Sequence, residues 1–159
     1  MAVQLPPDYR AFCALYQDAY LRYTQVRIRD VQAGRRIVAG ALGLLATQWP
    51  HALTTIRPTE VAWELLRSLI GRAGRATGGG PNSAGGCEVL YRALPAIQAD
   101  AVILRHRLLL DARSSAELMG TEPFTVTCQL TLAYRSLPVT FADCLQAAPG
   151  STSARNPAL

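Results

Sequence analysis

Apolar residues recur at intervals of three and four along most of the chain, which is the spacing of one face of an α-helix. Over residues 12–26 this spacing predicts a helix of about four turns, and over residues 37–45 it predicts a second helix. A third helix is expected to begin near Pro58 and to fray at Gly71 and Gly74. The first half of the sequence therefore predicts a helical bundle.

The second half has the same periodicity in shorter segments. Residues 89–94 predict a short helix and residues 101–108 a longer one. Residues 114–119 predict another short helix that stops at Gly120, and residues 123–137 open with a proline and carry one apolar face. A helix, a glycine turn and a helix at this spacing predict a helix-turn-helix. Because strand-like alternation is missing, the predicted fold class is all-α.

The sequence predicts two small helical domains, separated where the apolar periodicity stops. Residues 77–86 read TGGGPNSAGG, a Gly-rich composition typical of a flexible linker. This places one domain at residues 8–76 and the other at residues 87–145. Residues 146–159 are rich in Ala, Pro, Ser and Thr, and we expect a disordered tail there.

The composition excludes several classes of protein. Half of the 159 residues are hydrophobic, which excludes an intrinsically disordered chain. No apolar run reaches the roughly 18 residues of a membrane span, so no membrane association is predicted. The first ten residues have no apolar stretch of the kind found in secretory signals. We therefore expect a cytoplasmic protein.

Cysteine and histidine do not form a recognisable chemical site. The four cysteines never form a C-x-x-C pair, and only two histidines could join them as ligands. Buried, reduced thiols are the expected state in the cytoplasm. Neither histidine lies in a pattern that would activate a nucleophile. No metal site, cofactor or catalytic residue is predicted, and the chain is not expected to be an enzyme.

The positive charge is concentrated in the first half. The formal net charge is +5, and all sixteen basic residues are arginines. Residues 1–77 contain ten arginines and five acidic residues, whereas residues 87–144 contain five arginines and six acidic residues. The net positive charge of the chain therefore lies in its first half.

The segment LPAIQADAVILRHRLLLDARSSAELMGTEPFTVTCQLTLAYRSL, residues 94–137, resembles the domain of extracytoplasmic-function sigma factors that reads the promoter minus-35 element. That domain typically has a Leu-Pro pair, a polar stretch, an apolar helix, a small-residue helix ending in Leu-Gly, a Gly-Thr-Val run and a final basic helix. The matching positions here are Leu94-Pro95, Ala116-Glu117-Leu118, Gly120, Thr125-Val126 and Leu130.

The segment before the linker resembles the other domain of the same family, which binds core RNA polymerase and opens the minus-10 element. FCALYQDAYLRYTQVRIRD is similar to its first helix, RRIVAGALGLLATQW to its clamp-binding helix, and AWELLRSLIGRAGR to its promoter-facing helix. The two likenesses occur in the family's order. They imply a sigma-factor-like regulator of transcription initiation with core polymerase and promoter DNA as partners.

The resemblance also implies site residues. Those expected to face DNA are Trp63, Arg67, Arg72, Arg75, Thr125, Thr127, Gln129 and Arg135. Those expected at a protein partner are Arg35, Arg36, Val38 and Leu42.

Departures from the family pattern leave a second interpretation open. Arg35 and Arg36 stand where the family's clamp-binding helix carries an acidic pair, so like charges would oppose docking on the polymerase. On the predicted recognition helix Arg135 is the only basic residue, which predicts weak DNA binding. The alternative is a degenerate sigma-like protein that acts through another protein partner, such as an anti-sigma factor.

Structural interpretations also stay open for the same residues. Trp63 could pack in the core of the first bundle, with the nearby arginines forming a solvated face. The predicted helix-turn-helix could be a plain αα-hairpin. An unrelated helical enzyme is disfavoured because no acid-base or nucleophile group stands out.

Overall fold

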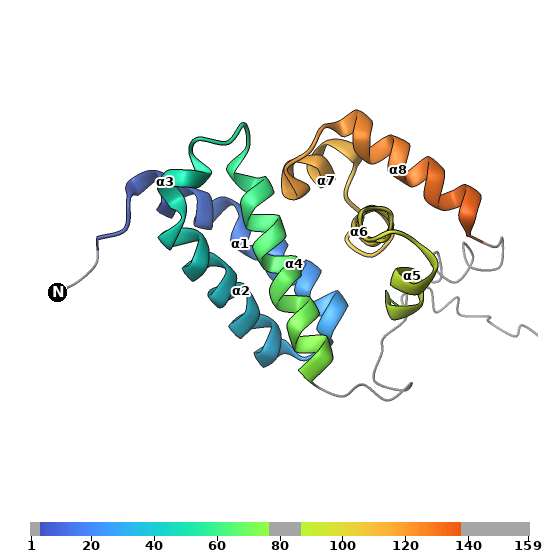
Figure 1. Ribbon diagram of the computed structural model, residues 1–159, viewed down its shortest axis with the longest axis horizontal. Helices are drawn as coiled ribbons and strands as arrows, with labels where there is room; N and C mark the ends of the chain where they lie inside the picture. The colour runs from blue at the N-terminus through green and yellow to red at the C-terminus, as the bar shows by residue number, and fades with distance from the viewer. Residues whose placement is uncertain (1–3, 77–86, 138–159) are drawn as a thin grey trace, which may run out of the picture.

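The computed structural model describes residues 4–76 and 87–137, and the regular structure in these ranges is entirely α-helical. The all-α prediction is confirmed for this part of the chain. The predicted linker, residues 77–86, and the predicted tail, residues 146–159, lie outside the described residues. The helices are α1 (Pro7–Ile28), α2 (Val31–Thr47), α3 (Trp49–Ala52), α4 (Pro58–Ala76), α5 (Cys87–Ala93), α6 (Ala96–His106), α7 (Ala112–Met119) and α8 (Pro123–Ser136) (Figure 1).

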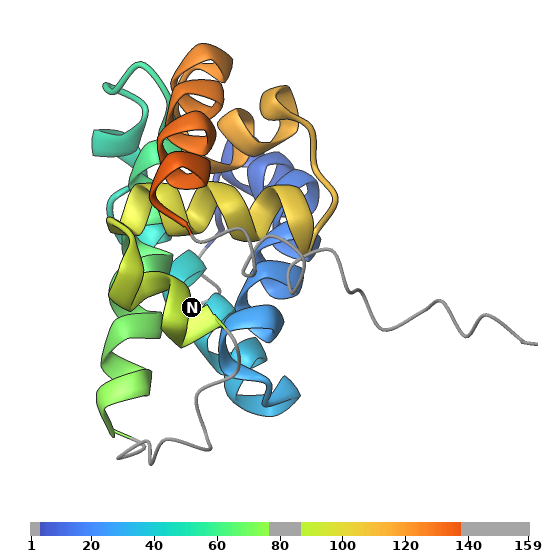
Figure 2. The ribbon, with the colours of Figure 1, turned by 90° about the vertical axis from the view of Figure 1, so that its right-hand side faces the viewer.

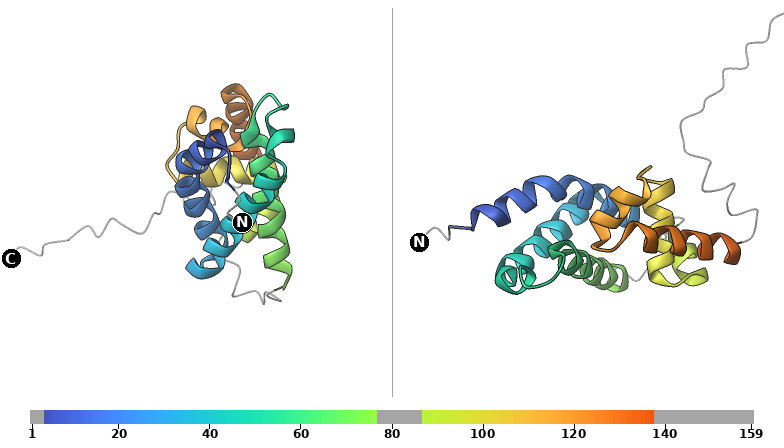
Figure 3. Two further views of the ribbon diagram at one scale, coloured as in Figure 1. Left: turned by 90° about the vertical axis from the view of Figure 1, so that its left-hand side faces the viewer. Right: turned by 90° about the horizontal axis from the view of Figure 1, so that it is seen from above.

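The first half is a bundle in which α1, α2 and α4 pack against one another. The long helices α1 and α2 run side by side, as the right-hand view of Figure 3 shows. Tyr20, Tyr23, Leu45 and Leu66 are among its fully buried side chains. Burying a side chain of the size of leucine contributes about 1.5–3 kcal/mol, so the predicted apolar faces supply the stability of the bundle.

Two polar residues set the turn between α1 and α2. The α1 helix ends at Ile28, and the next residue, Arg29, has a φ of 60° in the left-handed region. The carboxylate of Asp30 then accepts a hydrogen bond of 3.0 Å from the backbone N–H of Ala33, which caps the start of α2. The one-turn helix α3 was not predicted, because its four residues are too few to show a period.

The third predicted helix is longer than expected. Its pattern predicted fraying at Gly71 and Gly74, whereas α4 continues through both glycines to Ala76. The prediction was wrong because it used local propensity alone. Leu66 and Ile70 are buried one turn apart on the face that packs against α1 and α2, and this packing outweighs the cost of the glycines.

In the second half α6 forms the centre, and α8 lies across it (Figure 2). Ala99, Val102 and Ile103 of α6 are completely buried. The Asp111 carboxylate caps α7 by accepting a hydrogen bond of 2.7 Å from the N–H of Ser114. Gly120 ends α7 with a φ of 70°, which is why a glycine stands there. The predicted helices on both sides of this glycine are present.

The two halves are packed against each other. Helix α7 contacts both α4 and α1, and the buried apolar side chains of both halves form one continuous cluster. Their behaviour as two separate domains therefore stays a prediction. None of the helices in the described part of the chain is long and apolar enough to cross a membrane.

Candidate functional site

The candidate site is the junction where the second half packs on α4. At its centre lies Asp100, which follows Ala99 on α6 and is 0% exposed. Removing a carboxylate from water costs several kcal/mol unless partners compensate for the lost hydration. The groups around Asp100 must therefore compensate for the hydration that its carboxylate has lost.

Three elements supply these partners. The hydroxyl of Tyr23, on α1, donates a hydrogen bond of 2.6 Å to Asp100 Oδ1. The hydroxyl of Tyr91, on α5, donates to the same oxygen. The guanidinium of Arg67, on α4, places Nε 2.9 Å from Oδ2. This contact is an ion pair, and Oδ2 accepts no hydrogen bond in the described part of the chain. Asp100 thus joins both halves of the molecule.

A second arginine, Arg27, contacts the same tyrosines that bind Asp100. The Arg27 guanidinium stacks on the ring of Tyr91 at 4.0 Å from its centroid and donates a hydrogen bond of 3.0 Å to the Tyr23 hydroxyl. Burial, followed by the charge of Asp100, raises the pKa of Tyr23 above its ordinary value. Burial is also the largest cause of the raised pKa of Tyr91. Both phenols therefore stay protonated and keep donating to the carboxylate.

The junction has a second point of contact two turns away on α4. A Cβ atom added to Gly120 would lie 2.2 Å from the backbone nitrogen of Glu60, so only glycine allows the end of α7 to approach α4 this closely. An ion pair between Arg57 and Glu122 crosses the same edge. Because both partners of this pair reach solvent, we expect it to contribute little to stability.

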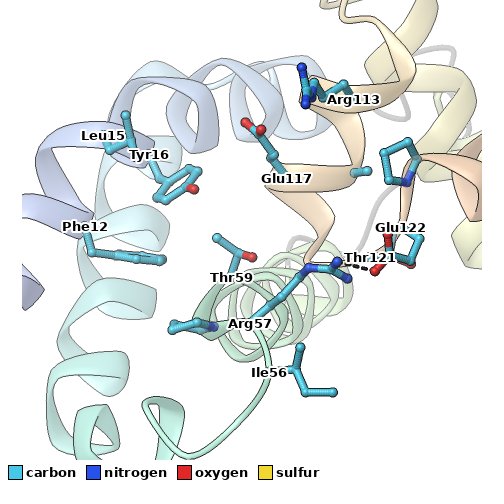
Figure 4. Close-up of a pocket in the computed structure, with 13 residues that line it drawn as sticks. Phe12, Leu15, Tyr16, Ile56, Arg57, Thr59, Arg113, Glu117, Thr121 and Glu122 are labelled. Carbon is cyan, nitrogen blue, oxygen red and sulfur yellow. Dashed lines mark hydrogen bonds and ion pairs between the residues drawn. The ribbon is translucent and has the colours of Figure 1, made fainter.

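An open groove of about 670 Å³ lies between α1, the start of α4 and the α7–α8 turn (Figure 4). Its apolar wall comes from Phe12, Leu15 and Tyr16 of α1. The facing wall is polar, with Arg57 and Glu122 paired across it. The other residues that line it are Ile56, Pro58, Thr59, Arg113, Ala116, Glu117, Thr121 and Pro123. Side chains of both charges line the groove, so the lining does not indicate one class of ligand.

Helix α8 turns one face inward and the other outward. Val126 and Ala133 are buried against the rest of the second half. On the outward face Phe124 is 78% exposed and Leu132 is 44% exposed. Tyr134 is anchored through a contact of 2.6 Å between its hydroxyl and the Nε2 atom of His106. The outward face is therefore largely uncharged.

The predicted DNA-facing residues of α4 fall into two groups. Trp63 is only 3% exposed, with its ring centroid 4.5 Å from that of Tyr23, and Arg67 is engaged by Asp100. The direct contact with DNA expected for Trp63 is therefore not open in this structure, and the alternative of a core tryptophan fits its position. Arg72 and Arg75 are exposed near the end of α4.

The predicted partner-binding residues of α2 are also divided. Arg35 and Arg36 are exposed, as a docking surface requires. Val38 and Leu42 are 1% and 8% exposed, so neither side chain lies on the surface of this structure, and their role at a partner stays a prediction. Their side chains lie in the core because α2 turns its apolar face toward α1 and α4.

The predicted recognition residues of α8 are spread along the helix. Thr127 and Arg135 are exposed, whereas Thr125 and Gln129 are half-buried. The Thr127 hydroxyl donates to the backbone carbonyl of Pro123 at 3.1 Å, so this hydroxyl is already used within the helix. The outward face of α8 consequently carries one cation, Arg135.

The sequence prediction missed the Asp100 cluster. One signal was present, because Asp100 stands alone within the apolar run from Ala99 to Leu104. A single acid on the inward face of a helix indicates a paired, buried charge. Its partners come from helices far apart in the sequence, so the pairing itself could not be read from spacing.

No protein-family model, curated protein or solved structure matches this chain.

Proposed function

We propose that the protein is a sigma-factor-like transcription regulator that helps to direct RNA polymerase to promoters. The observation that carries this proposal is the pair α7 and α8 around Gly120, backed by α6, with one face of α8 open to solvent. Two helices joined at a glycine, with the second exposed on one face, are compatible with a helix-turn-helix, a motif whose second helix enters the major groove. The helical unit that precedes this pair carries most of the arginines. The two units follow one another in the order expected for the family.

The exposed arginines indicate that the two units contribute unequally to the affinity for DNA. Phosphate neutralisation by arginine supplies most of the affinity for DNA. Arg72 and Arg75 are exposed on α4, whereas α8 has Arg135 alone. The first unit therefore supplies most of the DNA affinity, and α8 adds a weak contact to the promoter.

A second candidate function is binding to a protein partner other than the polymerase. The specific observation in its favour is that Arg35 and Arg36 are exposed side by side on α2, where they would attract an acidic surface. The exposed Phe124 and Leu132 on α8 offer apolar area to such a partner. This protein would then regulate transcription through an anti-sigma-like complex instead of through core polymerase.

Pull-down against core RNA polymerase and against cell lysate separates the two candidates. The tagged full chain is compared with the double variant Arg35→Glu/Arg36→Glu, which reverses the charge on α2. Arg10→Glu/Arg92→Glu is the matched control, because Arg10 and Arg92 are exposed on other helices and the net charge changes equally.

For a sigma-like regulator, the wild-type chain retains core polymerase at low ionic strength, and Arg35→Glu/Arg36→Glu retains more because repulsion is relieved. The control pair stays at the wild-type level. Absence of polymerase from every pull-down rejects the proposal. Loss of a different, acidic protein in the α2 variant alone favours the second candidate.

A further inference from the structure

A pocket of about 300 Å³ lies where the ends of α1 and α4 meet α5. It shares no lining residue with the groove at the α7–α8 turn. Its volume is at the lower end of the range of small-molecule sites, about 300–1,000 Å³. Helices of both halves form its walls, with Arg27 from α1, Gly71 and Arg75 from α4, and Glu88 and Tyr91 from α5.

Arg27 is fixed in position at this pocket without being neutralised by a carboxylate. Its guanidinium stacks on the Tyr91 ring and donates a hydrogen bond to the Tyr23 hydroxyl, and burial keeps the pKa of both phenols raised, so these partners are uncharged. The nearby carboxylate of Asp100 is paired with Arg67 instead. None of the ion pairs in the described part of the chain includes Arg27. Because a guanidinium has five N–H donors, Arg27 retains donors for another acceptor.

A second guanidinium lines the same pocket from α4. The Nη1 atom of Arg75 lies 3.9 Å from the position that a Cβ atom on Gly71 would occupy. The side chain of Arg75 therefore folds back over the preceding turn of its helix, where the glycine leaves space. Arg75 belongs to none of the ion pairs among residues 4–76 and 87–137, and the acid of the pocket lining, Glu88, is paired with Arg92 at 3.9 Å.

The surroundings of the pocket add further positive charge. Burial raises the pKa of the Cys87 thiol in the pocket wall, and three nearby arginines oppose this increase because each stabilises the thiolate: Arg107, Arg27 and Arg29. An anion is therefore the expected occupant. A phosphate group on a small molecule carries about 1.5–2 negative charges at neutral pH and has three acceptor oxygens, which matches two guanidiniums on different helices better than a carboxylate does.

We propose that this pocket binds the phosphate group of a small ligand between Arg27 and Arg75. The phosphate group bridges α1 and α4, and α5 forms the third wall, so the bound ligand contacts both halves of the molecule. A ligand that binds only the packed arrangement stabilises that arrangement. Such a site goes beyond the proposed function and does not depend on it.

Thermal unfolding of the full chain, followed by circular dichroism, tests the site. The Tm is measured in potassium phosphate, in glycerol phosphate and in acetate, each compared with chloride at the same pH and ionic strength. Inorganic phosphate and glycerol phosphate are expected to raise the Tm in a saturable way, whereas acetate is not. A rise with inorganic phosphate alone identifies the free ion as the ligand, and a rise with both identifies a phosphorylated molecule.

Two variants connect this rise to the pocket. Arg75→Gln is expected to weaken phosphate binding by about tenfold, the lower end of the effect of a hydrogen bond to a charged group. Arg72→Gln is its matched control, because it removes the same charge from α4 at an exposed residue outside the pocket lining. Gly71→Leu keeps both arginines and fills the pocket, so it should abolish the rise, whereas Gly43→Leu on α2 should retain it. Each variant is compared with itself in chloride, so a change in its own stability cancels.

A wild-type Tm that does not respond to either phosphate probe overturns the proposal, and an equal response to acetate overturns the assignment to phosphate. Equal loss in Arg72→Gln and Arg75→Gln also overturns the pocket, because the anion then responds to the overall charge of α4, as a DNA backbone would. A wild-type response in Gly71→Leu shows that phosphate binds elsewhere.

Discussion

The close approach of Gly120 to α4 predicts that the junction between the two halves is intolerant of a single methyl group. In Gly120→Ala the backbone must hold a φ of 70°, which costs an L-residue about 1–2 kcal/mol. The new Cβ would also lie 2.2 Å from the backbone nitrogen of Glu60, an atom that no side-chain rotation can move. Overpacking of this kind adds about 1–3 kcal/mol. The expected loss is therefore about 2–5 kcal/mol.

Urea denaturation of the full chain, followed by circular dichroism, measures this loss as a shift of the midpoint. Gly43→Ala is the matched control, since Gly43 lies in α2 with no atom within 4 Å of the added methyl. That variant should gain about 0.5–1 kcal/mol, because alanine favours the helix.

Gly120→Asn separates the two contributions. Asparagine tolerates the left-handed conformation better than alanine but carries the same Cβ. It should therefore remain clearly less stable than wild type. A Gly120→Asn variant with wild-type stability would refute the reasoning, because the end of α7 would then not be seated against α4.

Two further predictions concern charge. The hydrogen bond from the Ser114 N–H lowers the pKa of Asp111 below 3.8, so the stabilising effect of this cap is present above that pH and is lost as the pH falls through the lower, folded-state pKa. The stability difference between wild type and Asp111→Asn, measured by urea titration at several pH values, should change only in this acid range; a difference independent of pH would contradict the cap. Arg135→Gln should lower the slope of log Kobs against log salt for duplex DNA by about 1, and an unchanged slope would show that α8 does not contact phosphate.

The helices were predictable because their causes are local. Periodic apolar residues, Pro58 and Pro123 near helix starts and Gly120 at a helix end act over a few neighbouring positions. The predicted end of the third helix was wrong because packing against the other helices outweighs the low helix propensity of glycine. Helix α4 therefore continues through Gly71. The helix α3 is too short to carry a period.

The junction around Asp100 was not predicted, and the exposure of the partner residues expected on α2 was predicted only in part. The pattern identified Arg35 and Arg36 as exposed but could not tell that Val38 and Leu42, on the same helix, face the core. An apolar helical face looks the same in a sequence whether it covers its own bundle or a partner. The choice depends on which other helices surround it.

The sequence by itself determined where the longer helices lie, that a helix ends at Gly120, and that the positive charge lies in the first half. Only the tertiary structure decided that the two halves meet, that Trp63 is buried, and that Asp100 pairs with Arg67 across them. The physical reason is the sequence distance over which each interaction acts. Helix formation depends on residues a few positions apart, whereas burial and charge pairing depend on groups that only the packed chain brings within a few ångströms.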